Sequence, residues 1–197
     1  MAEGDIEYRY VAEEARSRMV GVLELSEFYK ALKRWCDFEG FSDGSSGGGK
    51  LFNEIMYKHI DKGGGVANVD IVWEVRKPSG SPYITYYIKI IWLLIGISKV
   101  EVVADGKKVK RDKGDFEIRM SARLEKDFKK MKGGFFGLKS LKRTWEKFLM
   151  KDEIEDHEEE LRRKFMSLQK FVRDWFEQHI QSPTGYPFET PSSFPSA

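Results

Sequence analysis

The chain has 197 residues, of which 41% are hydrophobic and 34% are charged, and its formal net charge is +2. This length suits one domain around a single core, and the composition excludes collagen-like and largely disordered chains. The longest apolar run, residues 90–97, is far shorter than the roughly 20 residues of a membrane-spanning helix. A single cysteine, Cys36, excludes an internal disulfide and a multi-cysteine metal site. Residues 1–5 are acidic, unlike a secretory signal, so we expect a cytoplasmic protein.

The first forty residues predict strand and then helix. Alternating hydrophobic residues within residues 5–25 predict one or two strands around a charged bend. After them, hydrophobic residues follow helical spacing, with Ser26 as the expected N-cap and Gly40 as the expected end of the helix. The residues expected on its buried face are Phe28, Ala31, Leu32, Trp35 and Cys36.

Residues 42–65 are predicted to form a loop and a second helix. Residues 42–49 consist of Ser, Asp and Gly, which is typical of a flexible loop. The hydrophobic residues that follow have helical spacing and predict a short helix that ends at Gly63; they are Leu51, Phe52, Ile55, Met56 and Ile60.

Residues 66–125 are predicted to form an antiparallel sheet, because period-two alternation recurs between turn residues. Residues 83–95 are apolar on both faces, as in a central strand that is covered on both sides. A further strand is expected from Val100, followed by a hairpin at Asp105-Gly106 and a second turn at Lys113-Gly114. The last strand has the most regular alternation, with inward-facing Phe116, Ile118, Met120, Ala122 and Leu124.

Residues 138–181 are predicted to be helical, with a kink or helix boundary near Lys151 and Asp152. Beyond that point, hydrophobic residues follow a heptad spacing, which needs a partner surface. That surface is the protein's own sheet, a symmetric copy of the same residues or another protein. The candidate interface residues are Leu161, Phe165, Leu168, Val172 and Trp175. Residues 182–197 hold four of the six prolines and are predicted to be a disordered tail.

Several segments together resemble uncharacterised archaeal proteins of similar length. They are residues 86–90, 100–110 and 113–118 and the long C-terminal helix. The resemblance covers residues 66–180 and rests on structural motifs. It implies no activity and no functional residues.

The predicted elements combine into an α+β fold in one domain, residues 1–181. An antiparallel sheet of four to six strands is packed by two short N-terminal helices and by the long C-terminal helical region. A helix-grip, START-like layout is one way to arrange these elements. This is an analogy of topology, and a fold does not determine a function.

No motif in the sequence predicts catalysis. Residues 44–50 match the spacing of a phosphate-binding loop and contain Gly-x-Ser-x-Gly, but Leu51 replaces the magnesium-binding hydroxyl and no hydrophobic strand precedes the loop. His59 is expected near a helix C-terminus, and His157 lies in an acidic helix start that we interpret as solvent-exposed. We therefore predict no catalytic, cofactor or metal site, and an enzyme is the least supported class.

A basic region and an apolar interior are the remaining candidate sites. Residues 107–147 contain fifteen Lys or Arg against six Asp or Glu, and they either contact anions or form an ordinary exposed face. The candidate basic surface comprises Lys107, Lys108, Lys110, Arg111, Lys113, Lys129, Lys130 and Lys132. The side chains that would line a cavity, or fill an ordinary core, are Trp73, Tyr86, Trp92, Met120 and Trp145.

Three functions follow from these features. The first is a non-catalytic binding or assembly module that engages a protein partner or a second copy through the long helix and the basic hairpin. The second is a carrier of an apolar small molecule between the sheet and the long helix. The third is a binder of nucleic acid or an anionic membrane through residues 107–147, with steep salt dependence.

Overall fold

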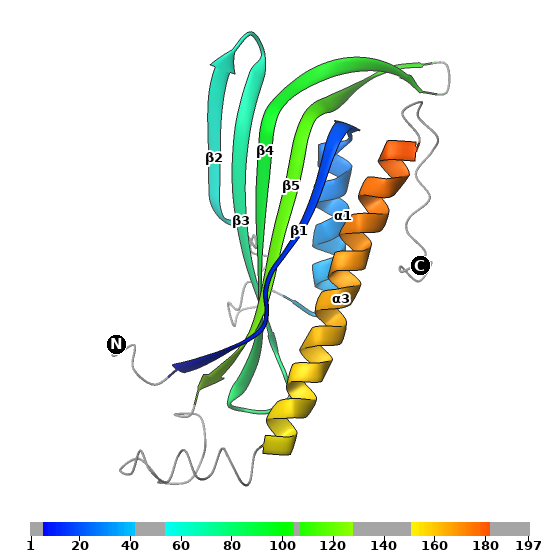
Figure 1. The fold of residues 1–197 in the computed structure, drawn as a ribbon. Helices are drawn as coiled ribbons and strands as arrows, with labels where there is room; N and C mark the ends of the chain where they lie inside the picture. Colours follow the sequence, from blue (N-terminus) through cyan, green and yellow to red (C-terminus); the bar gives the residue numbers. More distant parts are fainter. Residues whose placement is uncertain (1–5, 42–53, 105–106, 128–150, 182–197) are drawn as a thin grey trace.

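The computed structural model describes residues 6–41, 54–104, 107–127 and 151–181, which form an α+β fold (Figure 1). Five antiparallel strands make one sheet in the order β1-β5-β4-β3-β2. In chain order the elements are β1 (Ile6–Leu23), α1 (Leu25–Phe38), β2 (Glu54–Gly63), β3 (Val66–Pro78), β4 (Ile84–Ala104), β5 (Lys107–Asp127) and α3 (Lys151–Gln181).

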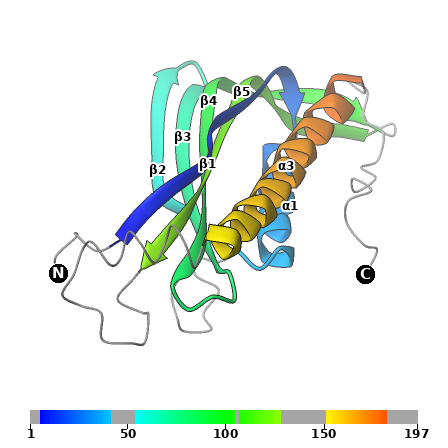
Figure 2. The same ribbon diagram turned by 60° about the horizontal axis from the view of Figure 1, so that its bottom comes forward.

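The sheet is curved, and both helices lie on the same side of it (Figures 1 and 2). α3 runs along the molecule and contacts β1, β5 and α1. The helices cover the inner face of the sheet, and the outer face lies on the opposite side. The described part therefore has a layer of helices on one face of an antiparallel sheet, as predicted, with one short N-terminal helix instead of two.

Aromatic side chains fill the space between the sheet and the helices. The Phe28 ring of α1 lies 5.1 Å from Trp92 on β4, and 5.7 Å and 5.3 Å from Trp175 and Phe176 on α3, measured between ring centroids. Burial of large aromatic rings is the main source of stability in such a core.

The prediction for α1 is confirmed on its buried face and wrong at its N-cap. All five side chains expected inside are buried: Phe28, Ala31, Leu32, Trp35 and Cys36. The helix begins at Leu25 with Glu24 at the cap, and no side chain caps it. Gly40 ends the helix as predicted, because its φ of +78° suits glycine and lets Phe41 N–H bond the Cys36 carbonyl.

The predicted second helix is instead the edge strand β2, which pairs with β3. Ile55 and Met56 are exposed, as is most of the strand, so their helical spacing did not reflect burial. His59 therefore lies on a strand, not near the end of a helix. Three glycines with positive φ angles turn the end of β2 into β3: Gly63, the last residue of β2, and Gly64 and Gly65.

The predicted turn at Lys113-Gly114 is also wrong, because β5 continues through it. β4 likewise continues through Val100, where we expected a new strand, and it bulges at Gly96 with φ +64°. A Cβ at Gly114 would lie 2.5 Å from Ile97 Cδ1, so glycine here permits close packing against the bulge. The expected hairpin after β4 is confirmed by the pairing of Ala104 with Lys107.

The predicted N-terminal strand is present, with Met19 and Leu23 buried but Tyr8 and Tyr10 exposed, and the last strand agrees with its alternation. β1 is a single strand with irregular register between Tyr10 and Ala15. All five predicted inward residues of β5 are buried: Phe116, Ile118, Met120, Ala122 and Leu124.

Several predictions lie outside the described residues. They concern the loop 42–49, the motifs in residues 44–50, the helical segment 138–150, Trp145, three of the predicted basic residues (Lys129, Lys130 and Lys132) and the tail 182–197.

Candidate interaction surface

The hydrophobic seam of α3 is covered by its own chain. Its five predicted interface residues are at most 4% exposed, namely Leu161, Phe165, Leu168, Val172 and Trp175. They belong to the same core cluster as the inner face of the sheet and α1. In the structure this seam, which we call the inner seam, is therefore an internal contact and not an exposed interface. Of the three partner surfaces considered from the sequence, packing against the protein's own chain accounts for the heptad spacing of this seam.

A buried tyrosine fixes the first half of α3 to β4. Tyr86 Oη lies 2.7 Å from His157 Nδ1 and 2.7 Å from Glu160 Oε2. The hydroxyl donates to the Glu160 carboxylate, which leaves its oxygen to accept from an Nδ1–H tautomer of His157. Burial, followed by the bond to Glu160, raises the pKa of Tyr86, so the hydroxyl stays protonated.

Ion pairs on both sides of α3 fix the orientation of the helix about its own axis. Lys164 Nζ lies 2.7 Å from Glu39 Oε2, just after the end of α1. On the other side, Glu158 pairs with Arg9 of β1. Since α3 is fixed through these contacts and the inner seam, the side chains that point away from the sheet form a defined surface.

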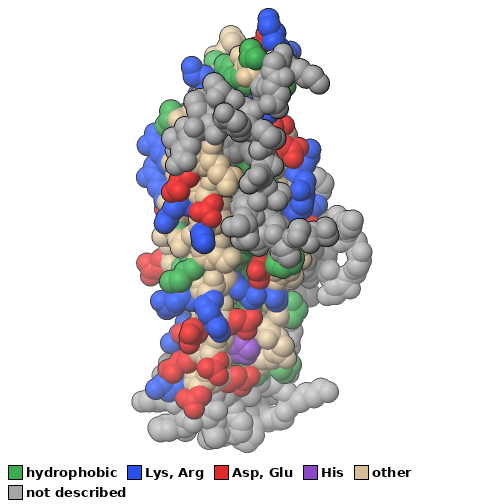
Figure 3. Space-filling model, turned by 90° about the vertical axis from the view of Figure 1, so that its right-hand side faces the viewer, with side chains coloured by type: hydrophobic (Ala, Val, Ile, Leu, Met, Phe, Trp, Pro, Cys, Tyr) green, Lys and Arg blue, Asp and Glu red, His purple; other side chains and the backbone are tan. Residues whose placement is uncertain are grey.

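That surface is a second seam, which we call the outer seam. Its members are all exposed and follow helical spacing: Asp152, Glu155, Glu159, Arg162, Arg163, Met166, Lys170 and Arg173. From Asp152 to Arg173 the charges separate along the helix, with acidic residues first and basic residues after them, and the exposed Glu177 follows one turn later. In Figure 3 acidic side chains gather at the lower end, where Figure 1 places the start of α3, and Lys and Arg lie directly above. Met166, 58% exposed, is its only large hydrophobic side chain.

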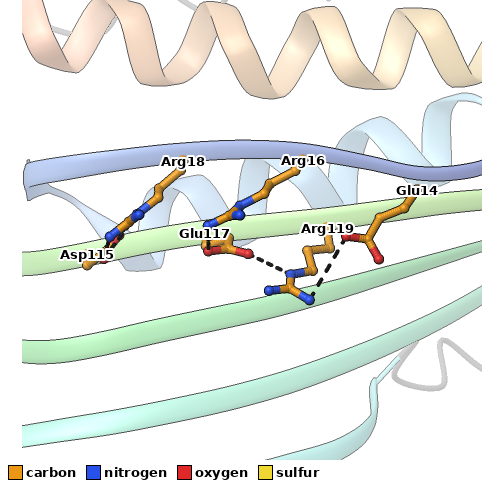
Figure 4. A network of polar contacts seen from close by, with 6 residues as sticks. All are labelled: Glu14, Arg16, Arg18, Asp115, Glu117 and Arg119. Atoms are coloured by element: carbon orange, nitrogen blue, oxygen red, sulfur yellow. Dashed lines mark hydrogen bonds and ion pairs between the residues drawn. The ribbon is translucent and has the colours of Figure 1, made fainter.

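Charges on the outer face of the sheet are arranged differently, because they pair across strands (Figure 4). Arg18 of β1 makes three hydrogen bonds to Asp115 of β5. Arg16 of β1 lies 2.6 Å from Glu117 of β5, and Arg119, on the same strand as Glu117, also lies 2.6 Å from it. The bond from Arg18 lowers the pKa of Asp115. Burial acts to raise the pKa of Glu117, but its bonds to Arg119 and Arg16 outweigh this and lower it.

The outer seam has little such pairing. Among the residues that the structure describes, only Glu155 of its seven charged members has an ion-pair partner, Lys151 at 3.7 Å. This cluster on the sheet pairs its charges within the chain, whereas most charges of the outer seam have no ion-pair partner among the described residues and are available to another molecule.

The predicted basic surface is placed only in part. Lys108, Lys110 and Lys113 are exposed on the β4–β5 hairpin. Arg111 is instead mostly covered and pairs with Glu24, which follows β1. The side chain of Lys107 is outside the described set. Binding of nucleic acid or an anionic membrane by this hairpin stays a prediction.

Four of the five predicted cavity residues lie in the core: Trp73, Tyr86, Trp92 and Met120. The rings of Trp73 and Trp92 lie 5.1 Å apart, and Phe28 packs on Trp92, so these residues pack on one another. The indole Nε1 of Trp92 is fully buried and has no hydrogen-bond partner among the described residues. An orphaned buried donor is rare in a core and calls for a partner.

Sequence reasoning missed the outer seam and the Tyr86 contacts. The outer-seam spacing was visible in the sequence, but a charged helix face is usually only exposed to solvent. His157, which we expected on an exposed acidic face, has a mostly covered side chain. Only the pairing of distant segments could place it beside Tyr86.

Within the described ranges, no three His, Cys, Asp or Glu side chains form a group that could hold a metal ion. No helix in that part of the chain is long and apolar enough to cross a membrane.

No family model matches the chain, and neither does any curated protein or solved structure. The resemblance to uncharacterised archaeal proteins therefore stays an expectation.

Proposed function

We propose that the protein is a non-catalytic assembly module that binds a protein partner through the outer seam of α3. The observation that carries the proposal is the difference between the two faces of one helix. The inner seam is buried in the core, and the outer seam, at similar spacing, is exposed along its length, with few ion pairs to any residue that the structure describes. Helices that pair with one another use this spacing.

The topology supports this role, because it holds the helix rigidly. β1 lies beside β5, and the long helix packs on the inner side of the curved sheet. We propose that this is a helix-grip, START-like arrangement. A helix held along its inner face presents its outer face without loss of conformational freedom, which lowers the entropic cost of binding.

A photo-crosslinking amino acid at position 166 tests the proposal. Met166 lies in the middle of the outer seam. The crosslinking residue placed there should therefore join the chain to a protein partner, either a second copy in a purified sample or another protein in an extract of its native cells. The matched control is position 20, because Val20 is also strongly exposed but lies on β1. Equal labelling at both positions, or none at position 166, would contradict the proposal.

A second candidate function is a carrier of an apolar small molecule, and the orphaned indole of Trp92 favours it. A ligand with a hydrogen-bond acceptor would satisfy this donor inside an otherwise apolar environment. Native mass spectrometry of the purified protein should then find an extra mass that denaturation removes. Trp92→Phe should reduce that extra mass, and Trp35→Phe, in a buried tryptophan of α1, is the control. A wild-type protein without extra mass contradicts the carrier.

A further inference from the structure

The outer seam of α3 is symmetric about a point between Arg162 and Arg163. Counted from that point, its eight positions form four equidistant pairs: 152 with 173, 155 with 170, 159 with 166, and 162 with 163. The two outermost pairs each join an acidic residue to a basic one. A second copy of the helix that runs in the opposite direction would therefore present opposite charges at these positions.

We propose that the partner is a second copy of this chain, which packs its α3 antiparallel against the outer seam around a two-fold axis near residues 162 and 163. Asp152 then faces Arg173 of the second copy, and Glu155 faces Lys170. Each contact occurs twice, because a two-fold interface uses the same surface on both subunits. This inference rests on the proposed function, since it names the partner of the same surface.

The charge pattern favours antiparallel pairing over the parallel alternative. Parallel helices would place Asp152 beside its own copy and Lys170 beside its own copy, and like charges in contact are destabilising. Antiparallel helices also bring opposite ends of their macrodipoles together. Four arginines meet at the axis, and on each helix Glu159 lies within one turn of Arg162 and Arg163 as a counter-charge.

Other occupants suit this surface less well. Nucleic acid or an anionic membrane would meet the acidic half of the outer seam, which repels it. Insertion into a membrane needs several apolar side chains, whereas the outer seam has only Met166. From residue 152 to 173 the seam extends about 32 Å at 1.5 Å per residue. A second copy of the helix can therefore contact it along this whole length and meet complementary charges at both ends.

Charge reversal on each half provides the first test. Asp152→Lys with Glu155→Lys makes the outer seam basic, and Lys170→Glu with Arg173→Glu makes it acidic. Analytical ultracentrifugation at about 0.02 M salt should find a wild-type dimer that weakens at about 0.5 M, because exposed charges are screened. Each double variant should raise the dimer Kd at least about tenfold, since it places like charges in contact.

Recombining the reversed halves separates this inference from general loss of folding. An equimolar mixture of the two double variants should form a heterodimer, because every contact between them at positions 152, 155, 170 and 173 joins opposite charges. The fourfold variant should form a homodimer again, because at all four exchanged positions opposite charges face each other once more. Retained folding of each variant is checked by circular dichroism.

Cysteine crosslinking tests the register. A short bis-maleimide should join two copies of Arg163→Cys, next to the axis, but not two copies of Asp152→Cys. Mixing Asp152→Cys with Arg173→Cys should restore crosslinking. The native Cys36 does not interfere, because it is buried and burial raises the pKa of its thiol to about 12.

The outcomes also separate the inference from the proposed function. A wild-type monomer at low salt, or a dimer unaffected by either double reversal, overturns antiparallel self-association. If position 166 nevertheless crosslinks to a different protein, the assembly role stands and its partner is not a second copy. If position 166 crosslinks to nothing, both fail.

Discussion

Along its inner seam, α3 has Leu161, Leu168 and Val172 fully buried against its own chain, while along its outer seam Met166 and Lys170 are exposed. The two faces share helical spacing, so spacing does not decide which one the chain uses itself. Side-chain chemistry decides, because the hydrophobic effect buries the apolar face and leaves the charged face in water. Since spacing does not distinguish the two faces, the order of the charges is the feature of the outer seam that can specify a partner.

The largest expected effect comes from breaking the inner seam. Leu168→Ala removes a fully buried side chain and leaves a cavity, so the free energy of unfolding should fall by about 2–5 kcal/mol. Met166→Ala, two residues away on the outer seam, should change it by less than about 0.5 kcal/mol. Urea unfolding measures both. Similar losses for the two variants would mean that the outer seam is packed against the chain as well.

A polar contact on the inner side should contribute less. Tyr86→Phe removes the hydroxyl between His157 and Glu160, and it should lower the free energy of unfolding by about 1–2 kcal/mol, because both partners lose a bond. Tyr57→Phe, on the exposed face of β2, is the control. If the two variants unfold alike in urea, the Tyr86 contacts do not hold α3 to the sheet.

The paired charges on the sheet predict a dependence on pH. The folded pKa values of Asp115 and Glu117 are lowered, so their stabilisation is present above their unfolded pKa values, about 4, and is lost as the pH falls further. The loss should be on the order of 1 kcal/mol, since Arg16 and Arg18 are half exposed.

Urea unfolding from pH 6 to pH 2 measures this loss, and Asp115→Asn with Glu117→Gln should flatten it. Arg18→Gln should remove the part due to Asp115, because the guanidinium is the cause of that shift. An unchanged pH profile in Arg18→Gln would show that the pair contributes no stability.

The smallest effect on stability is expected on the outer seam. Lys170→Glu should change the free energy of unfolding by less than about 0.5 kcal/mol, because Lys170 is exposed and has no ion-pair partner among the described residues. The measurement belongs at about 0.5 M salt, where association through charges is screened. A larger loss would mean that this charge serves the fold itself.

Local patterns predicted much of the fold where burial and period agree. The buried face of α1, the inward residues of β5 and the inner seam are all amphipathic, so their hydrophobic period reports directly which side faces the core. The central position of β4 in the sheet is confirmed, but the expectation that both of its faces are covered is not, since Ile95 on the outer face is exposed.

The same reasoning failed where side chains do not report burial. β2 is an exposed edge strand, so the hydrophobic residues Ile55 and Met56 follow no period set by a core. Gly114 suggested a turn because glycine is common in turns, whereas here it accommodates Ile97 across a bulge. The conformation of β2 and the role of Gly114 both depend on which strand lies beside them, and the local sequence does not specify that neighbour.

The candidate surface divides in the same way. The sequence by itself determined the class of the fold, the heptad spacing of the inner seam and the charges of α3, because these depend on side-chain type and period along one element. Only the tertiary structure decided that the inner seam packs on its own chain, that Tyr86 reaches His157 and Glu160, and that the outer seam is exposed. Those facts depend on contacts between segments far apart in the sequence, such as β4 with α3, whose free energy comes from burial and pairing in three dimensions.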